Sequence, residues 1–152
     1  MQKTFQYPEF AYRRSDEQAE GRARRHPVVV VGAGPVGLSA ALDLASRGIR
    51  TVVLDDNNTV SVGSRAVCYA KRPLEIWDRL GCGQPLVDKG VGWKVGKVFF
   101  RDQPVYSFDL LPEAGHKMPA MINLQQYYLE QCLVDACERS PLVELRWKHK
   151  VT

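Results

Sequence analysis

Residues 28–37 read Val-Val-Val-Val-Gly-Ala-Gly-Pro-Val-Gly, and this stretch decides the fold class. Four consecutive β-branched residues favour a strand of the kind that parallel sheets bury on both faces. The glycine-rich turn leads into apolar residues at helical spacing, namely Leu38, Ala41, Leu42 and Ala45, before a stop at Gly48. A second apolar run over residues 51–54 ends at Asp55. The sequence therefore predicts a β-α-β unit of the α/β class.

The glycines have the spacing Gly32-x-Gly34-x-x-Gly37, and each has its own task in binding a dinucleotide. The first permits a tight turn, the second lets the backbone approach a pyrophosphate, and the third lets helix and strand pack closely. The helix N-terminus then faces the phosphates. Asp55 lies 23 residues after Gly32, where an acid accepts hydrogen bonds from ribose hydroxyls and repels the 2′-phosphate of NADP. The alternative is a glycine-rich turn in an unrelated α/β protein.

Further along, helical and strand-like patterns alternate. The expected elements are a helix over residues 71–81, a β-hairpin over 93–110 with its connection at 101–104, a helix over 124–139 capped by Asn123, and a strand over 143–147. Residues 1–27 are different, because they carry six basic and four acidic side chains and no apolar segment of a secretory signal. We expect them to form a solvated or loosely docked N-terminal arm.

Composition excludes several classes of protein. Apolar residues make up 45% of the 152-residue chain and charged ones 25%, which is typical of a folded domain. The net charge of +4 is mild and evenly spread, so it does not indicate a nucleic-acid partner. No apolar run approaches the ~20 residues that cross a bilayer, so we expect no membrane partner.

The four cysteines and three histidines show no metal-binding or redox spacing. There is no Cys-x-x-Cys pair, and no histidine lies at ligand spacing from another histidine or a cysteine. We expect reduced thiols that play no part in catalysis, no metal, and a cytoplasmic location.

Three segments in this order resemble the FAD-dependent aromatic hydroxylases, which are single-component flavoprotein monooxygenases, and in particular their 3-(3-hydroxyphenyl)propionate hydroxylase-like members. The first segment is residues 28–55. The second combines Gly-Ser-Arg-Ala at 63–66 with Lys-Arg-Pro-Leu-Glu-Ile-Trp-Asp-Arg-Leu-Gly at 71–81. The third is Asn-Leu-Gln-Gln-Tyr-Tyr-Leu-Glu at 123–130. The first motif is shared by many flavoproteins, whereas the ordered series is more specific.

The resemblance implies FAD as the cofactor and assigns residues to it. Asp55 stands where most relatives have Glu and would bind the adenosine ribose. Arg65 matches an arginine near the FAD phosphate and ribityl chain, and Gln126 matches a glutamine that touches the ribityl chain, with Gln125 as the neighbouring alternative. The pyrophosphate loop comprises Gly32, Gly34, Pro35, Val36 and Gly37.

The implied architecture is a Rossmann-like FAD-binding βαβ domain interrupted by a β-hairpin of a second, substrate-binding domain. The expected division is an arm over 1–27, the first part of the FAD domain over 28–90, the hairpin segment over 91–120, and the continued FAD domain over 121–152. Family segments that complete the flavin and nicotinamide sites are not found, so we expect an N-terminal part that is catalytically incomplete alone.

The implied activity is hydroxylation of a phenolic or related aromatic substrate with NAD(P)H as co-substrate and O2. Since the flavin supplies the oxygen chemistry, we assign no catalytic side chain, and we expect Tyr106 and His116 to be structural. Two alternatives stay open, a non-catalytic FAD or NAD binding module and another FAD-dependent oxidoreductase that shares only the glycine motif. Assembly into a homo-oligomer is also left open.

Overall fold

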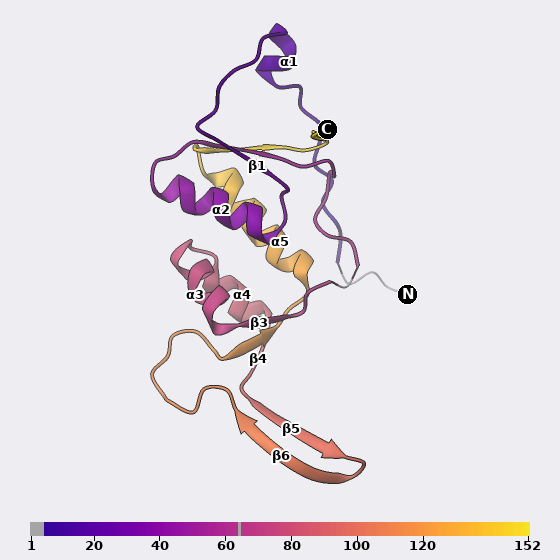
Figure 1. Cartoon of the computed structure of the whole chain (residues 1–152), viewed down its shortest axis with the longest axis vertical. Helices are drawn as coiled ribbons and strands as arrows, with labels where there is room; N and C mark the ends of the chain where they lie inside the picture. Colours follow the sequence, from indigo (N-terminus) through magenta and orange to yellow (C-terminus); the bar gives the residue numbers. More distant parts are fainter. Residues whose placement is uncertain (1–4, 64) are drawn as a thin grey trace. The chain divides into compact units, whose positions relative to one another are not determined.

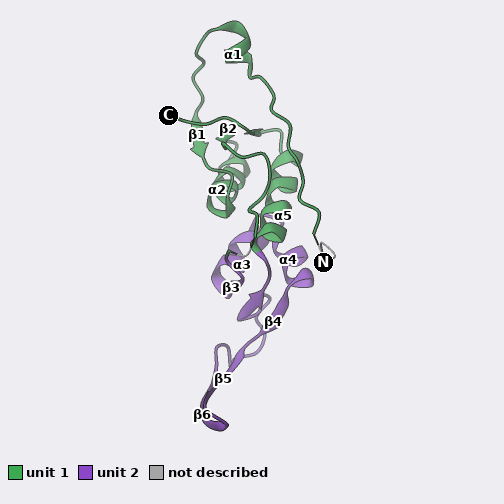
Figure 2. Ribbon diagram, turned by 90° about the vertical axis from the view of Figure 1, so that its right-hand side faces the viewer, with its two compact units in different colours: residues 1–65, 126–152 green, residues 66–125 purple. Residues whose placement is uncertain are grey.

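The chain forms two compact units, shown in Figure 2. The structure, a computed structural model, describes residues 5–63 and 65–152. Unit 1 consists of residues 1–65 and 126–152, and unit 2 of residues 66–125. These boundaries differ from the expected ones because the helices that follow residue 70 pack within unit 2. The assignment of functional domains to the sequence stays a prediction.

A three-stranded parallel sheet lies at the centre of unit 1 (Figure 1). Its strands are β1 (Val28–Val31), β2 (Thr51–Leu54) and β8 (Val143–Arg146), in the order β1-β2-β8. Both neighbouring pairs are parallel and in register, so the three carboxyl ends lie at one edge of the sheet. The three strands and the α/β class predicted from the sequence are therefore confirmed.

Two helices cover one face of this sheet, α2 (Pro35–Ser46) and α5 (Gln126–Arg139) (Figure 1). α2 begins directly after the glycine-rich turn with Pro35 at its first position, and Gly48 follows its end with a φ of +76°. The core between helices and sheet consists of fully buried aliphatic side chains, including Leu38, Ala41, Val53, Leu129, Leu133 and Val134.

Strand β1 is not buried on both faces, which corrects the expectation from its sequence. Val29 and Val31 are 47% and 66% exposed, whereas Val30 lies beside α2. β1 is an edge strand, and both covering helices lie on the opposite face from these two side chains. Both strands consist largely of β-branched residues. The first three residues of β2 are all buried, whereas burial alternates along β1.

Unit 2 contains a second, antiparallel sheet in the order β3-β7-β4. Its strands are β3 (Cys68–Ala70), β7 (Met121–Asn123) and β4 (Val91–Trp93), and its helices are α3 (Lys71–Arg79) and α4 (Gly83–Lys89). Leu74, Leu86 and Ile122 are buried between these elements. Helix α3 was predicted, but the three-residue strands and the seven-residue α4 were not, because such short elements carry little periodicity.

Asn123 does not cap a helix, contrary to the prediction. It ends strand β7, and α5 begins at Gln126. The Asn123 Oδ1 atom accepts hydrogen bonds from Trp93 Nε1 at 2.9 Å and from the Cys68 thiol at 3.2 Å. The Asn123 side chain therefore bonds to side chains of both outer strands.

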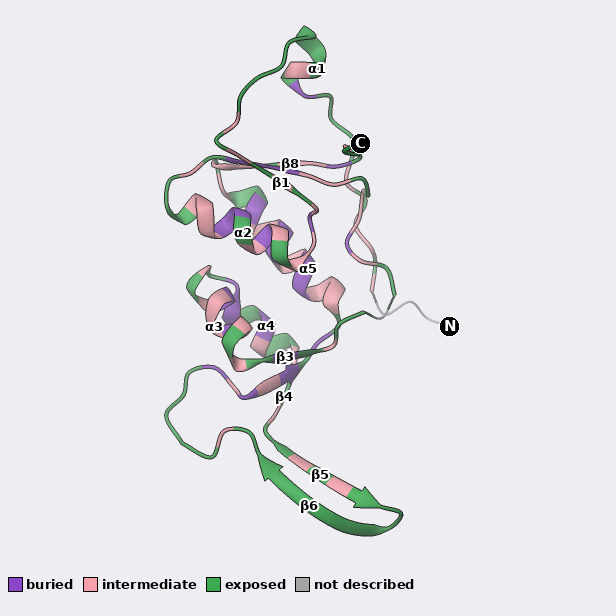
Figure 3. Cartoon of the chain, in the orientation of Figure 1, coloured by how far each residue is buried: buried purple, intermediate pink, exposed green. Residues whose placement is uncertain are grey.

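The predicted hairpin is formed by β5 (Val95–Phe100) and β6 (Gln103–Asp109). Its connection is tighter than expected, because Gln103 and Pro104 belong to β6 and Arg101 takes a left-handed φ of +56°. Every residue of β6 is exposed (Figure 3). The Phe108 ring lies over Gly96, where an added Cβ would come within 2.2 Å of the ring.

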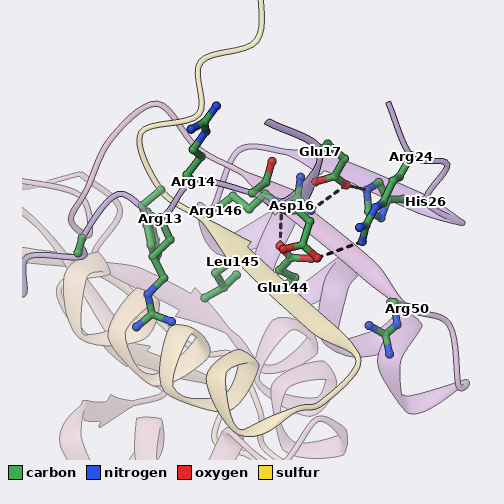
Figure 4. A pocket seen from close by; sticks show the side chains of 13 residues that line it. Arg13, Arg14, Asp16, Glu17, Arg24, His26, Arg50, Glu144, Leu145 and Arg146 are labelled. Carbon is green, nitrogen blue, oxygen red and sulfur yellow. Dashed lines mark hydrogen bonds and ion pairs between the residues drawn. The ribbon is translucent and has the colours of Figure 1, made fainter. Parts of the chain in front are cut away.

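The N-terminal arm docks on unit 1. Its short helix α1 (Asp16–Glu20) starts at a capping box formed by Ser15 and Gln18. The Glu17 carboxylate pairs with Arg146 of β8 at 3.2 Å and with His26, beside a cavity of about 400 Å³ (Figure 4). The arm is thus more firmly attached than the loose docking that we expected.

All four cysteines are free thiols, and two of them, Cys82 and Cys137, are buried. Burial, and after it the negative charge of Glu138, raises the pKa of the Cys137 thiol to about 12. No helix in the described chain combines the length and apolarity that crossing a bilayer requires.

Gly37→Ala should lower the free energy of unfolding by about 3 kcal/mol, the upper range for overpacking. An added Cβ would lie 1.9 Å from the Gly32 carbonyl oxygen, so helix and strand would have to separate. Gly34→Ala is the matched control, because nothing lies within 4 Å of its Cβ position. It should change stability by no more than about 1 kcal/mol, since N-cap preference and unfolded-chain entropy oppose each other. Urea titration measures both, and equal midpoints would contradict the packing argument.

Protonation of Glu17 should weaken the docking of the arm in acid. Its own backbone N–H, Arg146, His26 and Ser15 lower the pKa of this carboxyl from 4.5 to about 2. The carboxylate therefore favours the folded state above the unfolded pKa, and this contribution is lost as the pH falls towards 2. The difference in urea midpoint between the parent chain and Glu17→Gln should shrink between pH 4.5 and 2. A constant difference over that range would contradict the role of the charge.

Candidate functional site

The glycine-rich turn has the geometry that its spacing predicts. Gly32 has a φ of +103°, which favours glycine. Gly34 is the N-cap of α2, with extended backbone, open space at its Cβ position and no side-chain cap on the helix. The first turn of α2 therefore offers N–H groups that no capping side chain covers. Gly37 allows the close approach of helix and strand described above.

Asp55 holds this turn against the end of β2. Its Oδ2 atom accepts a hydrogen bond from the Ala33 N–H at 2.6 Å, and its Oδ1 atom accepts one from the Asn57 N–H at 2.8 Å. Each carboxylate oxygen has about two lone-pair positions, so both oxygens can accept a further hydrogen bond. Asp55 therefore both supports the turn and presents acceptors beside it.

A cavity of about 230 Å³ joins these elements within unit 1. It is lined by Ala33, Gly34, Asp55, Asn57, Thr59, Val60, Ser61, Val62, Arg65 and Glu130. Half of these lining residues come from residues 57–63, which we call the cavity loop. Arg65 follows this loop and adds a positively charged side chain to a lining that also contains the carboxylate of Asp55.

The lining also contains the buried hydroxyl group of Thr59. The hydroxyl oxygen of Thr59 is buried and makes no hydrogen bond within the described chain. A buried hydroxyl without a partner costs free energy, and a polar ligand in the cavity would satisfy it. Thr59 therefore belongs with Asp55 and Arg65 as a candidate ligand contact.

The far side of the cavity loop is held by a buried carboxylate. Glu130 of α5 is only 2% exposed and accepts hydrogen bonds from both the N–H and the hydroxyl of Ser61, the latter at 2.7 Å. Gln126, one turn earlier on α5, donates to Glu130 at 2.6 Å and to the Ser61 hydroxyl at 3.1 Å. This network joins α5 to a loop some 65 residues earlier in the sequence.

The structure brings together three of the eight predicted contact residues in the lining of this cavity, namely Gly34, Asp55 and Arg65. Gly32 lines an adjoining cavity of about 210 Å³ that Asp55 also borders. Pro35 is the first residue of α2, Val36 is 84% exposed, and Gly37 supports packing. Gln126 does not line the cavity and instead contacts Glu130 and Ser61. Their roles as cofactor contacts stay predictions.

Sequence reasoning missed Glu130, Thr59 and Ser61. The signal for Glu130 was available, because an acid four residues after Gln126 falls on the same helical face, beside the buried Leu129 and Leu133. Nothing in the sequence distinguishes Thr59 or Ser61 from other polar loop residues.

These residues fit the adenosine diphosphate part of a dinucleotide. The open space at Gly34 leaves room for a pyrophosphate, Arg65 suits a phosphate, and Asp55 and Thr59 suit hydroxyl groups. The cavity is smaller than the ~300–1,000 Å³ of common ligand pockets, so it accounts for only part of such a molecule. Larger cavities of about 400 and 600 Å³ lie along the arm and β8, and one of about 330 Å³ lies in unit 2. None of the three is lined by the glycine motif. Within residues 5–63 and 65–152, no three His, Cys, Asp or Glu side chains form a metal-binding group.

The fold and the site together define a dinucleotide-binding α/β protein. The FAD binding domain family matches residues 25–152, and the chain belongs to this family. The glycine motif of this chain therefore belongs to a family whose cofactor is FAD.

Relatives define the branch of the family. The chain is 34% identical over 135 residues to para-nitrophenol 4-monooxygenase of Pseudomonas sp. (strain WBC-3), covering 82% of this chain and 31% of that protein. It is 27% identical to a 3-(3-hydroxy-phenyl)propionate/3-hydroxycinnamic acid hydroxylase of Mycobacterium sp. (strain JLS), covering 82% and 22%. The crystal structure of p-nitrophenol 4-monooxygenase from Pseudomonas putida DLL-E4 superposes with a TM-score of 0.74 at 33% identity, over 83% of this chain and 32% of that one.

The predicted resemblance to FAD-dependent aromatic hydroxylases is thus confirmed. The chain spans about a third or less of the length of the relatives that it matches.

Glu130→Ala should lower the free energy of unfolding by about 1–3 kcal/mol, because it leaves Ser61 and Gln126 without their shared acceptor. Glu138→Ala, on the exposed side of the same helix, is the control and should stay within about 0.5 kcal/mol of the parent. Urea denaturation measures both variants. Equal free energies of unfolding for Glu130→Ala and Glu138→Ala would show that the buried network adds no stability.

Proposed function

We propose that this chain is the FAD-binding portion of a flavoprotein monooxygenase that hydroxylates a phenolic substrate with NAD(P)H and O2. The observation that carries the proposal is the cavity where the glycine-rich turn, Asp55 and Arg65 meet. The named activities of the relatives support an aromatic substrate carrying a hydroxyl group.

In this proposal each part of the site has one task. The N-terminus of α2 and Gly34 bind the pyrophosphate, and Arg65 neutralises part of its charge. Asp55 accepts hydrogen bonds from the adenosine ribose, and Thr59 donates or accepts one within the same cavity. Gln126 lies one turn before Glu130 at the start of α5, the end from which it could contact the ribityl chain.

When bound, FAD supplies the redox and oxygen chemistry, which protein side chains lack. The chain's own residues bind and orient the cofactor. The hairpin β5–β6 exposes Phe99, Phe100 and Tyr106, which are 55%, 68% and 57% exposed. An apolar surface of this kind is suited to further protein contacts, and we assign it to the substrate-binding part of the enzyme.

The visible spectrum of the purified chain tests cofactor binding. Bound flavin absorbs near ~450 nm, and we expect this band after reconstitution with FAD and removal of excess. Retention of ADP or NAD without FAD would instead favour the non-catalytic nucleotide-binding module. Consumption of NADH and NADPH with a panel of phenolic acids and nitrophenols, followed by chromatography for hydroxylated product, separates a monooxygenase from another FAD-dependent oxidoreductase.

Gly34→Val should abolish FAD retention, because a branched side chain would occupy the space that the pyrophosphate needs. Since that space is open in the folded chain, the variant should still fold. The measurements are the flavin absorbance after desalting and the far-ultraviolet circular dichroism. Normal FAD retention by the folded variant would overturn the assignment of this turn.

Arg65→Ala should weaken FAD binding by about 1–3 kcal/mol and make the remaining affinity less sensitive to salt. Arg65→Lys should recover part of the loss, because it keeps the charge without the bidentate geometry. The control is Arg50→Ala, an exposed arginine of unit 1 that lines a different cavity. Fluorescence titration with FAD at low and at high salt measures the affinities of the parent chain and the three variants. An unchanged salt dependence in Arg65→Ala would remove Arg65 from the phosphate site.

A further inference from the structure

The cavity loop, residues 57–63, is held from two sides. Towards the sheet and α5, Asp55 accepts the Asn57 N–H and Glu130 accepts the Ser61 N–H. On the other side, the loop backbone is bound by the N-terminal arm. The Phe10 N–H donates to the Asn58 carbonyl at 2.8 Å, and the Gly63 N–H donates to the Tyr7 hydroxyl oxygen at 3.3 Å.

The arm segment that makes these contacts is anchored at both ends by aromatic rings. At one end, Phe5 packs against Tyr127 and Tyr128 at the start of α5, with ring centroids 4.4 and 5.0 Å apart. At the other end, Phe10 stacks on Trp147, at 4.3 Å and an interplanar angle of 14°. Trp147 is only 6% exposed, so this stacking is part of the packed structure of unit 1.

Tyr7 lies between these two anchors in the sequence and takes part in the one at the start of α5. Its ring packs against Tyr127 at 5.6 Å, and burial together with Tyr128 and Tyr7 raises the pKa of the Tyr127 phenol. The Tyr7 hydroxyl is therefore held at Gly63, which has a φ of +85°. Two residues later, Arg65 lines the cavity.

The matched family region begins at residue 25, so the residues that make these contacts lie outside it. We infer that residues 5–10 position the cavity loop for FAD, so that the arm is part of the cofactor site although it does not line the cavity. The inference rests on the proposed function. Its physical basis is that a loop held in its binding conformation loses less conformational entropy when the ligand binds.

Such coupling is reciprocal. If arm docking raises the affinity for FAD by a given factor, FAD raises the equilibrium constant for arm docking by the same factor. Two independent measurements on the chain therefore test the inference, one of FAD affinity in arm variants and one of arm protection in the parent.

The variant is Phe5→Ala combined with Tyr7→Ala, which removes the anchor on α5 and the acceptor for Gly63 but leaves Phe10 on Trp147. We expect its FAD affinity to fall at least about fivefold, the lower range of measured site–site coupling. The control is Tyr12→Ala, an arm tyrosine that stacks on His149 and donates to Gln18 and has no contact with the cavity loop in the described chain. Its affinity should match that of the parent.

The second measurement is hydrogen–deuterium exchange of the parent with and without FAD. Exchange at Phe10 and Gly63 should slow on FAD binding, whereas exchange in β5–β6 should not. Tyr7→Phe keeps the ring and removes the hydroxyl oxygen, so FAD should protect Gly63 less in this variant.

The outcomes separate the two proposals. If the parent does not bind FAD, the proposed function fails and this inference with it. If the parent binds FAD but the double variant binds equally well, or if FAD leaves exchange at Phe10 and Gly63 unchanged, the inference alone is overturned.

Discussion

The site depends on how closely helix α2 approaches strand β1. Gly37 faces the Gly32 carbonyl with no room for a Cβ, and this contact fixes the direction in which α2 leaves the sheet. Because Gly34 is the N-cap of this helix, the same contact determines where its N-terminal N–H groups point. A parallel sheet then places the ends of β1 and β2 at one edge, so that Asp55 lies beside the turn. Packing at one glycine thus positions both the electropositive and the acidic parts of the cavity.

Two carboxylates organise the cavity by accepting backbone hydrogen bonds. Asp55 binds the turn and the start of the cavity loop, and Glu130 binds the middle of that loop from α5. A buried carboxylate is costly unless its oxygens are satisfied, and Glu130 meets this condition through Ser61 and Gln126. These groups join segments that are far apart in the sequence. The shape of the loop is therefore a property of the folded unit, because its own residues have no regular secondary structure.

The chain also exposes apolar surface of two kinds. In unit 1, Val29 and Val31 project from the edge strand β1, and in unit 2, the hairpin β5–β6 exposes aromatic rings along its length. An edge strand with exposed branched side chains and an isolated hairpin are features that proteins normally cover. The relatives that the chain matches are about three times its length. The N-terminal arm shows the opposite case, in which a segment outside the matched family region has its own anchors on β8, α5 and the cavity loop.

The sequence by itself determined the β-α-β unit and the chemistry at its ends. The glycine spacing, the β-branched runs and the acid after β2 are local patterns, and local patterns carry the information for a turn, a strand and a helix start. The tertiary structure decided what no local pattern encodes. Three-residue strands such as β3 and β7 exist because their partners lie alongside, so Asn123, which looked like a helix cap, ends a strand instead. Likewise Glu130 reaches the cavity, and the arm reaches the cavity loop, only through contacts across the fold, because their positions depend on packing between segments that the sequence separates by tens of residues.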